Sequence, residues 1–371
     1  NNWQSLTKVT VQSGSIGNGA FQNCTSLNSI DLREGVTSIG DNVFATCPGM
    51  EELIIPTTVK SIGANAFINW KNLTKLTVPA GSIGEEAFKN CTSLKKVVFE
   101  EGLREIGESA FESCAITELD LPDTVFKIGK SAFSFCTKLE SVVLPDELEE
   151  LAERTFFDTG LKELTIPDGM RVIGKLCFCS CIQLESAILP ESIEMIDNGA
   201  FSICSSLKSI KMPEESFLGD SAFSSCSDLE SIIVPKGLTN LGKSTFQGCT
   251  SLSEVVLPDS LNNIGEYAFS SCESLKTITI PDKVENIDYM AFNNCKNLET
   301  VLGGSGIKSV VDSAFQFCHA LKSLEFSPKI EDIGEYVFWK CESMESIDLS
   351  NLLNTVSSNA FIECTNLSEV I

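Results

Sequence analysis

The chain has 371 residues, 43% of them hydrophobic, and its 51 Asp and Glu against 27 Lys and Arg give a formal net charge of −24. A surface this acidic repels the phosphates of nucleic acids and of anionic lipids, so we expect neither nucleic-acid binding nor direct membrane insertion. No apolar run of about 18 residues, the length needed to span a bilayer, occurs in the sequence.

One phrase repeats along the whole chain. It reads I-G-x-x-A-F-x-x-C-x-x-L-x-x-I-x-I-P, and residues 264–281 match it in full. A fixed period of about 23 residues is typical of a solenoid, in which each repeat contacts only its neighbours. We therefore expect one repeat domain over residues 1–371, as a fragment of a longer chain. The phenylalanines of the sixteen copies, 21 to 23 residues apart, are Phe21, Phe44, Phe67, Phe88, Phe111, Phe133, Phe156, Phe178, Phe201, Phe223, Phe246, Phe269, Phe292, Phe315, Phe338 and Phe361.

Each repeat divides into three predicted elements. The segment L-x-x-I-x-L alternates apolar and variable residues, which predicts a short strand that pairs in parallel with its copies. Eleven of the twelve prolines follow this strand and end it, because proline donates no hydrogen bond to a ladder. The next segment, V-x-x-I-G, is predicted to be extended and to end in a left-handed corner, since glycine, or aspartate at 197 and 288, tolerates positive φ. The last segment, x-x-A-F-x-x-C, is predicted to form a helical turn with Ala, Phe and Cys inward.

The cysteines follow the repeat. Fourteen of the sixteen lie three residues after the repeat phenylalanine, where Trp70 and Thr159 stand in the other two copies. Such regularity is typical of small buried hydrophobic side chains, so we favour a column of free thiols. A disulfide between turns about 4.8 Å apart is the alternative. In the local cluster Cys177, Cys179 and Cys181, we expect Cys179 to be exposed, because polar residues stand at its position in other copies. A structural zinc site needs four converging ligands, so we expect no metal here.

Other groups that carry chemistry are sparse. His319 is the sole histidine and is expected in a solvent-facing turn, which excludes sites built from several histidines. The acidic pairs Glu100-Glu101, Glu149-Glu150 and Glu214-Glu215 fall at turns, where a solvated rim is favoured over acid–base or calcium chemistry. No phosphate-binding loop, nucleophile elbow or zinc-protease motif occurs. We therefore expect no enzymatic activity and no cofactor.

The repeat phrase, L-x-x-I-x-L-P followed by V-x-x-I-G-x-x-A-F-x-x-C, resembles the BspA-type (Treponema pallidum-type) leucine-rich repeat over essentially the whole chain. It departs from the commonest leucine-rich repeats, which place an asparagine where this chain has a proline and an acidic or polar residue, as in Leu144-Pro145-Asp146. The resemblance implies a curved solenoid of about sixteen repeats, with a parallel β-sheet on the concave face and short extended or helical turns on the convex side. Similar proteins occur in gut and oral bacteria and in protists, often at the cell surface, and several are linked to adhesion. The resemblance implies no catalytic residues.

The two variable positions of L-x-x-I-x-L are predicted to face outward over the sheet, since successive side chains of a strand alternate between its faces. The second of these positions forms an interrupted apolar stripe flanked by small hydroxyl side chains, which indicates a contact surface. The alternative is that β-branched residues stand there because they favour strands. The residues that we predict to bind a partner are Val143, Ser186, Ile188, Ser209, Lys211, Ser231, Ile233, Glu254, Val256, Thr277, Thr279 and Leu302.

These observations favour a non-enzymatic scaffold at the cell surface, or secreted, whose concave face binds a protein or glycoprotein of a host or a microbe. Two alternatives stay open. The first is a cytoplasmic interaction scaffold of a protist, which reduced cysteines would suit. The second is a structural component that associates with other copies through its uncapped ends.

Overall fold

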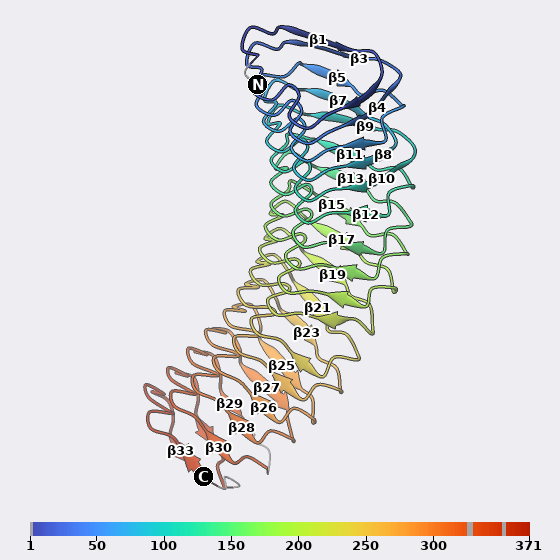
Figure 1. The fold of residues 1–371 in the computed structure, drawn as a ribbon. Coiled ribbons are helices and arrows are strands. Elements are labelled where there is room, and N and C mark those ends of the chain that lie inside the picture. The colour runs from blue at the N-terminus through green and yellow to red at the C-terminus, as the bar shows by residue number, and fades with distance from the viewer. Residues whose placement is uncertain (1–2, 325–328, 351–353) are drawn as a thin grey trace. The chain divides into compact units, whose positions relative to one another are not determined.

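The structure is a computed structural model that describes residues 3–324, 329–350 and 354–371. It groups the chain into two compact units, Asn1–Leu184 and Glu185–Ile371. Inside each unit, every turn of the chain contributes short strands that stack on those of the next turn (Figure 1). The single domain over residues 1–371 stays a prediction, and Pro328, one of the strand-ending prolines, lies outside the described residues.

In the first unit the L-x-x-I-x-L segments form one set of parallel strands, in which β1 pairs with β3, β5 with β7, β7 with β9 and β11 with β13. The V-x-x-I segments form a second ladder that runs from β2 through β12, together with the pair β14 and β16. The first set is β1 (Lys8–Val11), β3 (Ser29–Leu32), β5 (Glu52–Ile54), β7 (Lys75–Val78), β9 (Lys96–Phe99), β11 (Glu118–Asp120), β13 (Ser141–Val143) and β15 (Glu163–Thr165). The second is β2 (Gly14–Ile16), β4 (Val36–Ile39), β6 (Ser61–Ile62), β8 (Gly81–Ile83), β10 (Leu103–Ile106), β12 (Lys127–Ile128), β14 (Glu150–Leu151) and β16 (Val172–Ile173).

The second unit has the same two sets. In the first set β17 pairs with β19, β21 with β23, β25 with β27, β27 with β29 and β31 with β33. In the second set β18 pairs with β20, and a ladder runs from β22 through β32. The first set is β17 (Ser186–Ile188), β19 (Ser209–Lys211), β21 (Ser231–Ile233), β23 (Glu254–Val256), β25 (Thr277–Ile280), β27 (Thr300–Gly303), β29 (Ser323–Leu324), β31 (Ser346–Ile347) and β33 (Glu369–Val370). The second is β18 (Met195–Ile196), β20 (Phe217–Leu218), β22 (Asn240–Leu241), β24 (Asn263–Ile264), β26 (Asn286–Ile287), β28 (Ser309–Val310), β30 (Asp332–Ile333) and β32 (Thr355–Val356).

The segment around each repeat phenylalanine turns the chain as predicted, but through left-handed residues rather than a helix. The described residues contain no helix. Backbone φ is instead positive two residues before and two residues after the phenylalanine, for example +57° at Tyr267 and +62° at Ser271 around Phe269. Alternate N–H groups then donate to the next turn, from Phe269 to the Ala291 carbonyl at 2.8 Å and from Ser271 to the Asn293 carbonyl at 2.8 Å. These inter-turn bonds offset the unfavourable left-handed backbone.

The glycine of I-G is required for a different reason from the one predicted. The positive φ expected at this corner is wrong, because the left-handed residues lie in the phenylalanine turn. At Gly63 an added Cβ would lie 2.4 Å from the carbonyl carbon of Gly40 and 2.5 Å from the backbone nitrogen of Asp41. The corner therefore favours glycine because the backbones of adjacent turns approach closely there.

The core is a column of aromatic rings beside a column of thiols. Phe269 is fully buried and stacks on the rings of Phe246 and Phe292, with centroids 5.5 and 5.3 Å away. Every cysteine is a free thiol. Cys272 Sγ donates to the Phe246 carbonyl at 3.2 Å. The cysteine position thus supplies a hydrogen-bond donor to the preceding turn.

Trp70 explains why tryptophan can replace cysteine in this column. Its indole Nε1–H donates to the Phe44 carbonyl at 3.0 Å, the same kind of bond that the thiols make. The larger ring fits because Gly49 lies against it, where a Cβ would approach the indole to 2.9 Å. The prediction of a small buried hydrophobic position therefore omitted its polar role.

The prediction that Cys179 is exposed is wrong: only 5% of it is accessible to solvent. Its position, one residue after the repeat phenylalanine, also holds Ala45 and Ser134, which are buried too. Because neighbouring turns stack about 4.8 Å apart, they cover a short side chain in this column, while longer polar side chains extend past them.

Candidate functional site

Six outward side chains of the second unit form a row that we call the sheet-face stripe: Ile188, Lys211, Ile233, Val256, Thr279 and Leu302. The strands align them in register, with Ile188 opposite Lys211 and Ile233 opposite Val256. The four aliphatic members are 64%, 66%, 56% and 48% exposed, in the order Ile188, Ile233, Val256 and Leu302. The predicted outward orientation is therefore observed. Large aliphatic side chains that are exposed along one row form an apolar patch facing solvent.

The flanking row is polar, as the sequence indicates. It lies two residues before the stripe on each strand and consists of Ser186, Ser209, Ser231, Glu254, Thr277 and Thr300. All of these are exposed except Ser231 and Thr300, which are half-buried. Val143, the remaining predicted residue, belongs to the first unit, where it lies on β13 opposite Asp120 and is 60% exposed.

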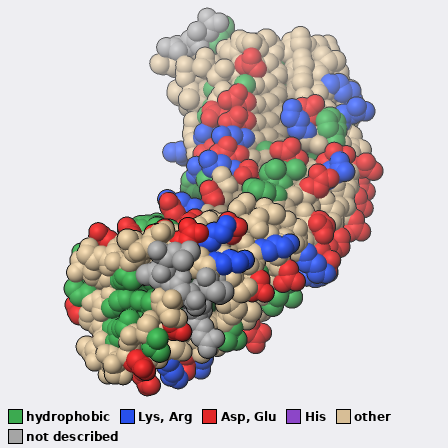
Figure 2. Space-filling view, turned by 90° about the horizontal axis from the view of Figure 1, so that it is seen from below, with side chains coloured by type: hydrophobic (Ala, Val, Ile, Leu, Met, Phe, Trp, Pro, Cys, Tyr) green, Lys and Arg blue, Asp and Glu red, His purple; other side chains and the backbone are tan. Residues whose placement is uncertain are grey.

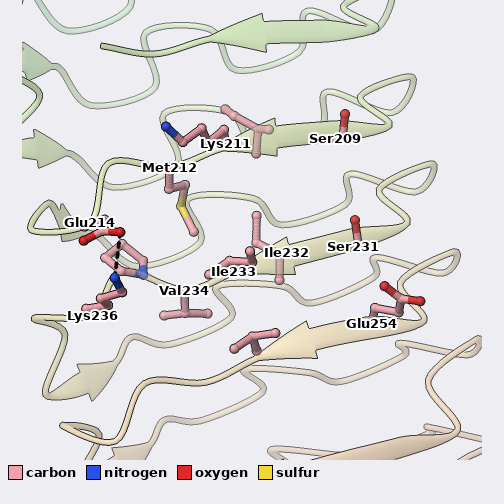
Figure 3. A pocket seen from close by; sticks show the side chains of 13 residues that line it. Ser209, Lys211, Met212, Glu214, Ser231, Ile232, Ile233, Val234, Lys236 and Glu254 are labelled. Carbon is pink, nitrogen blue, oxygen red and sulfur yellow. Dashed lines mark hydrogen bonds and ion pairs between the residues drawn. The ribbon is translucent and has the colours of Figure 1, made fainter. Parts of the chain in front are cut away.

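The stripe contains a hollow of about 450 Å³ over β19, β21 and β23. Figure 3 shows Ser209, Ser231 and Glu254 at the starts of these strands, and Glu214 and Lys236 beyond their ends. The residues that line the hollow are Ser209, Ile210, Lys211, Met212, Glu214, Ser231, Ile232, Ile233, Val234, Pro235, Lys236, Glu254 and Val256. This volume is within the range of small ligand sites, and most of the lining side chains are apolar.

Ion pairs occupy one margin of the hollow. Lys211 Nζ lies 2.7 Å from the Glu191 carboxylate, and Lys236 Nζ lies 2.7 Å from Glu214 (dashed in Figure 3). The hydrogen bond from Lys211 holds the pKa of Glu191 below its ordinary value, and the same bond raises the pKa of Lys211. Glu254, on the opposite margin, forms no ion pair with any described residue.

Sequence reasoning missed this margin. The turn residues Glu214 and Lys236 and the buried Met212 and Val234 were not predicted to border the site, nor was the pairing of Glu191 with Lys211 predicted. A usable signal was present, because Lys211 follows Glu191 by 20 residues and Lys236 follows Glu214 by 22. Opposite charges about one repeat apart lie on adjacent turns and can pair.

The same pairing recurs across the second unit. Lys208 lies 2.9 Å from Glu185, and Lys243 lies 2.7 Å from Glu266. Figure 2 shows acidic and basic side chains interspersed over the face in view. Surface pairs of this kind contribute little to stability because solvent and salt screen them. Their larger effect is to neutralise lysines, which leaves the acidic excess of the chain as the net field.

The histidine and the thiols do not line the hollow. His319 is half-exposed, in accord with the predicted turn, and its Nδ1 lies 3.6 Å from the Glu342 carboxylate. Burial raises the pKa of the Cys181 thiol to about 12, and it also raises the pKa of the Cys177 thiol. In the described ranges, no group of three or more His, Cys, Asp or Glu is placed to hold a metal ion. Nor does this part of the chain contain a helix long and apolar enough to cross a membrane.

Comparison with known proteins matches the repeat along the whole chain. The sequence model of the family described as "BspA type Leucine rich repeat region" matches residues 1–82, 69–185, 171–299 and 299–371. No protein with a curated description matches the chain.

The chain is also similar to solved structures, two of which, with TM-scores above 0.5, share its fold. A leucine-rich repeat protein from Bacteroides ovatus is 29% identical, with a TM-score of 0.72, and the match covers 98% of this chain and 86% of that one. The pneumococcal vaccine antigen PcpA is 21% identical, with a TM-score of 0.53 and coverage of 86% and 82%. A leucine-rich cell surface protein from Faecalibacterium prausnitzii is 20% identical, with a TM-score of 0.46 and coverage of 98% and 87%.

Proposed function

The chain belongs to the BspA-type leucine-rich repeat family, and from this premise we propose that it is a non-enzymatic scaffold whose sheet-face stripe binds another protein. The observation that carries the proposal is the row of exposed aliphatic side chains in the second unit, above all Ile188 and Ile233. Strand propensity alone does not require a large aliphatic side chain at a solvated position, because threonine is also β-branched and suits a strand. Covering such a side chain in a complex contributes about 1.5–3 kcal/mol.

The proposal includes a location outside the cell, in line with what the repeat phrase implies about similar proteins. Sixteen free thiols would ordinarily favour a reducing compartment. Burial weakens that objection, because it raises the pKa of Cys136, Cys249 and Cys295 to about 12. Thiols that stay protonated and covered react slowly with oxidants and disulfides, so they are compatible with an oxidising environment. Labelling of intact producing cells with a membrane-impermeant amine reagent tests this: failure to label the chain before lysis would place it inside the cell.

The test of the stripe is differential capture. The double variant Ile188→Lys, Ile233→Lys places two charges on the stripe, whereas Ile54→Lys changes a residue 62% exposed at the equivalent row of the first unit. Immobilised wild-type chain and both variants are incubated with host and microbial lysates, and proteins retained by the wild type are identified and purified. Their direct binding is then measured.

We expect the double variant to lose the identified partner, and Ile54→Lys and the wild type to retain it equally. Because all three positions are solvated, the unfolding midpoints should agree within the error of the measurement. Equal retention by the double variant, with its fold intact, would refute the proposal. Light scattering on the wild type distinguishes the alternative of self-association through the ends, which the stripe substitutions would leave unchanged.

A further inference from the structure

We infer that the partner segment seated on the stripe is cationic, and that it presents one large apolar side chain to the hollow with Lys or Arg next to it. This inference rests on the proposed function and specifies the chemistry of the partner. It follows from the shape of the hollow, from the hydrogen bonding of its floor and from the charges at its margins.

The floor of the hollow selects for side chains rather than for a peptide backbone. Main-chain groups of a strand point sideways within the sheet, as in the bond from the Val234 N–H to the Val256 carbonyl at 3.0 Å, whereas side chains stand out from its face. A segment seated over the face therefore meets side chains, and it does not lie where strand addition would place it. The lining offers aliphatic surface from Ile233 and Val256 instead. A leucine, methionine or phenylalanine side chain of the partner fits this chemistry.

The margins add a negative field. Both lysines that border the hollow are held by acids, Lys211 by Glu191 and Lys236 by Glu214, each at 2.7 Å. Glu254 is exposed and carries the one uncompensated charge among the lining residues. The chain as a whole adds a net charge of −24. An anionic segment would meet repulsion here, whereas a cationic one is attracted at long range and can pair with Glu254 on contact.

The spacing joins the two requirements in one short segment. Glu254 and Val256 project from the same face of β23, two residues apart, and Val256 lies opposite Ile233. A partner side chain that contacts Ile233 and Val256 therefore has its neighbouring residues within reach of Glu254. The hydroxyls of Ser209 and Ser231 lie along the same margin and can accept from or donate to the segment.

The experiment uses a displayed library of random linear peptides selected on the chain of 371 residues, with Ile54→Lys as the matched control. We expect enriched peptides to combine a large apolar residue with adjacent Lys or Arg, and the affinity of a representative peptide to fall as salt increases. Ile233→Lys should abolish its binding. Glu254→Lys should weaken it by about tenfold or more, and a peptide with its Lys and Arg changed to Glu should bind Glu254→Lys better than it binds wild type.

The outcomes separate the two proposals. If Ile233→Lys abolishes peptide binding but the enriched peptides are not basic and Glu254→Lys has no effect, the cationic partner is overturned and the stripe remains a protein-binding face. If peptide binding is unchanged by Ile233→Lys, both the stripe and the cationic partner are overturned. No selective enrichment on the wild type also overturns the linear cationic segment. A glycan-array signal that Ile233→Lys removes would assign the hollow to carbohydrate instead. Unfolding midpoints of all variants exclude loss of fold as the cause.

Discussion

Replacing Phe269 with alanine should lower the free energy of unfolding by about 3–5 kcal/mol, the usual cost of removing a buried aromatic ring. The ring is fully buried and is stacked between Phe246 at 5.5 Å and Phe292 at 5.3 Å. Each such ring pair contributes about 0.5–1.5 kcal/mol beyond the area it buries. Close packing on both sides leaves the neighbouring turns little freedom to collapse into the cavity.

The matched variant is Phe361→Ala, which removes the same residue type from the same column. Phe361 is half-buried and stacks on one ring, Phe338, at 5.3 Å. We therefore expect it to cost about half as much as Phe269→Ala. Guanidinium unfolding followed by far-ultraviolet circular dichroism measures both variants against the wild type. A cost at Phe361 equal to that at Phe269 would show that two-sided ring stacking does not set the stability of the column.

Three further predictions concern the column of thiols and the residues beside it. Gly49→Ala should destabilise the chain by about 1–3 kcal/mol, because the added Cβ would approach the Trp70 indole to 2.9 Å. The cost should be smaller in a Trp70→Cys background. Additive costs in a double-mutant cycle would contradict the contact. Brief alkylation at mildly alkaline pH should modify the half-buried Cys364 well before Cys179, and early labelling of Cys179 would contradict its burial. Burial raises the pKa of Cys295 to about 12, whereas the pKa of an unfolded thiol is about 8.5. The protonated Cys295 thiol therefore contributes its full stability below pH about 8.5, and this contribution is lost as pH rises toward about 12. Unfolding midpoints measured across that range should fall with pH.

The repeat phrase was sufficient to predict the architecture, because turns of nearly identical sequence bury their apolar residues by stacking on one another in register. It predicted the parallel strands, their ends at proline and the inward columns, as β25 before Pro281 and the buried Phe269 illustrate. It did not predict the second ladder of strands. The V-x-x-I segment alternates too briefly, in β24 over Asn263 and Ile264 alone, to be distinguished from a turn by pattern.

Backbone conformation was the least predictable feature. Positive φ was expected at the recurring corner glycine and occurs instead at Tyr267 and Ser271, residues that rarely adopt it. The left-handed backbone there is imposed by hydrogen bonds between turns, which depend on the stacked solenoid and not on local preference. Gly63 is required by the proximity of Gly40, a contact between residues one repeat apart. Neither cause can be seen in a single copy of the phrase.

The candidate surface was predictable in orientation but not in composition. Alternation within each strand was enough to place Ile188 and Ile233 outward. The lysine–glutamate pairs that border the hollow come from turns, and their effect on the local field depends on which acids they leave unpaired. Glu254 can be identified as an unpaired charge at the hollow only when those ion pairs are known.

The variable positions of the repeat are therefore not equally free to carry function. The second residue before and the second residue after each phenylalanine must adopt a left-handed backbone, as Asn65 and Asn69 do around Phe67. Others pair charges between turns, as Lys243 does with Glu266 at 2.7 Å. The outward strand positions that hold aliphatic side chains have no such structural duty, since these side chains face solvent and form no ion pair. Selection can change Ile233 there without disturbing the column beneath it, which is why the sheet face, and not the turns, is where this scaffold can acquire a partner.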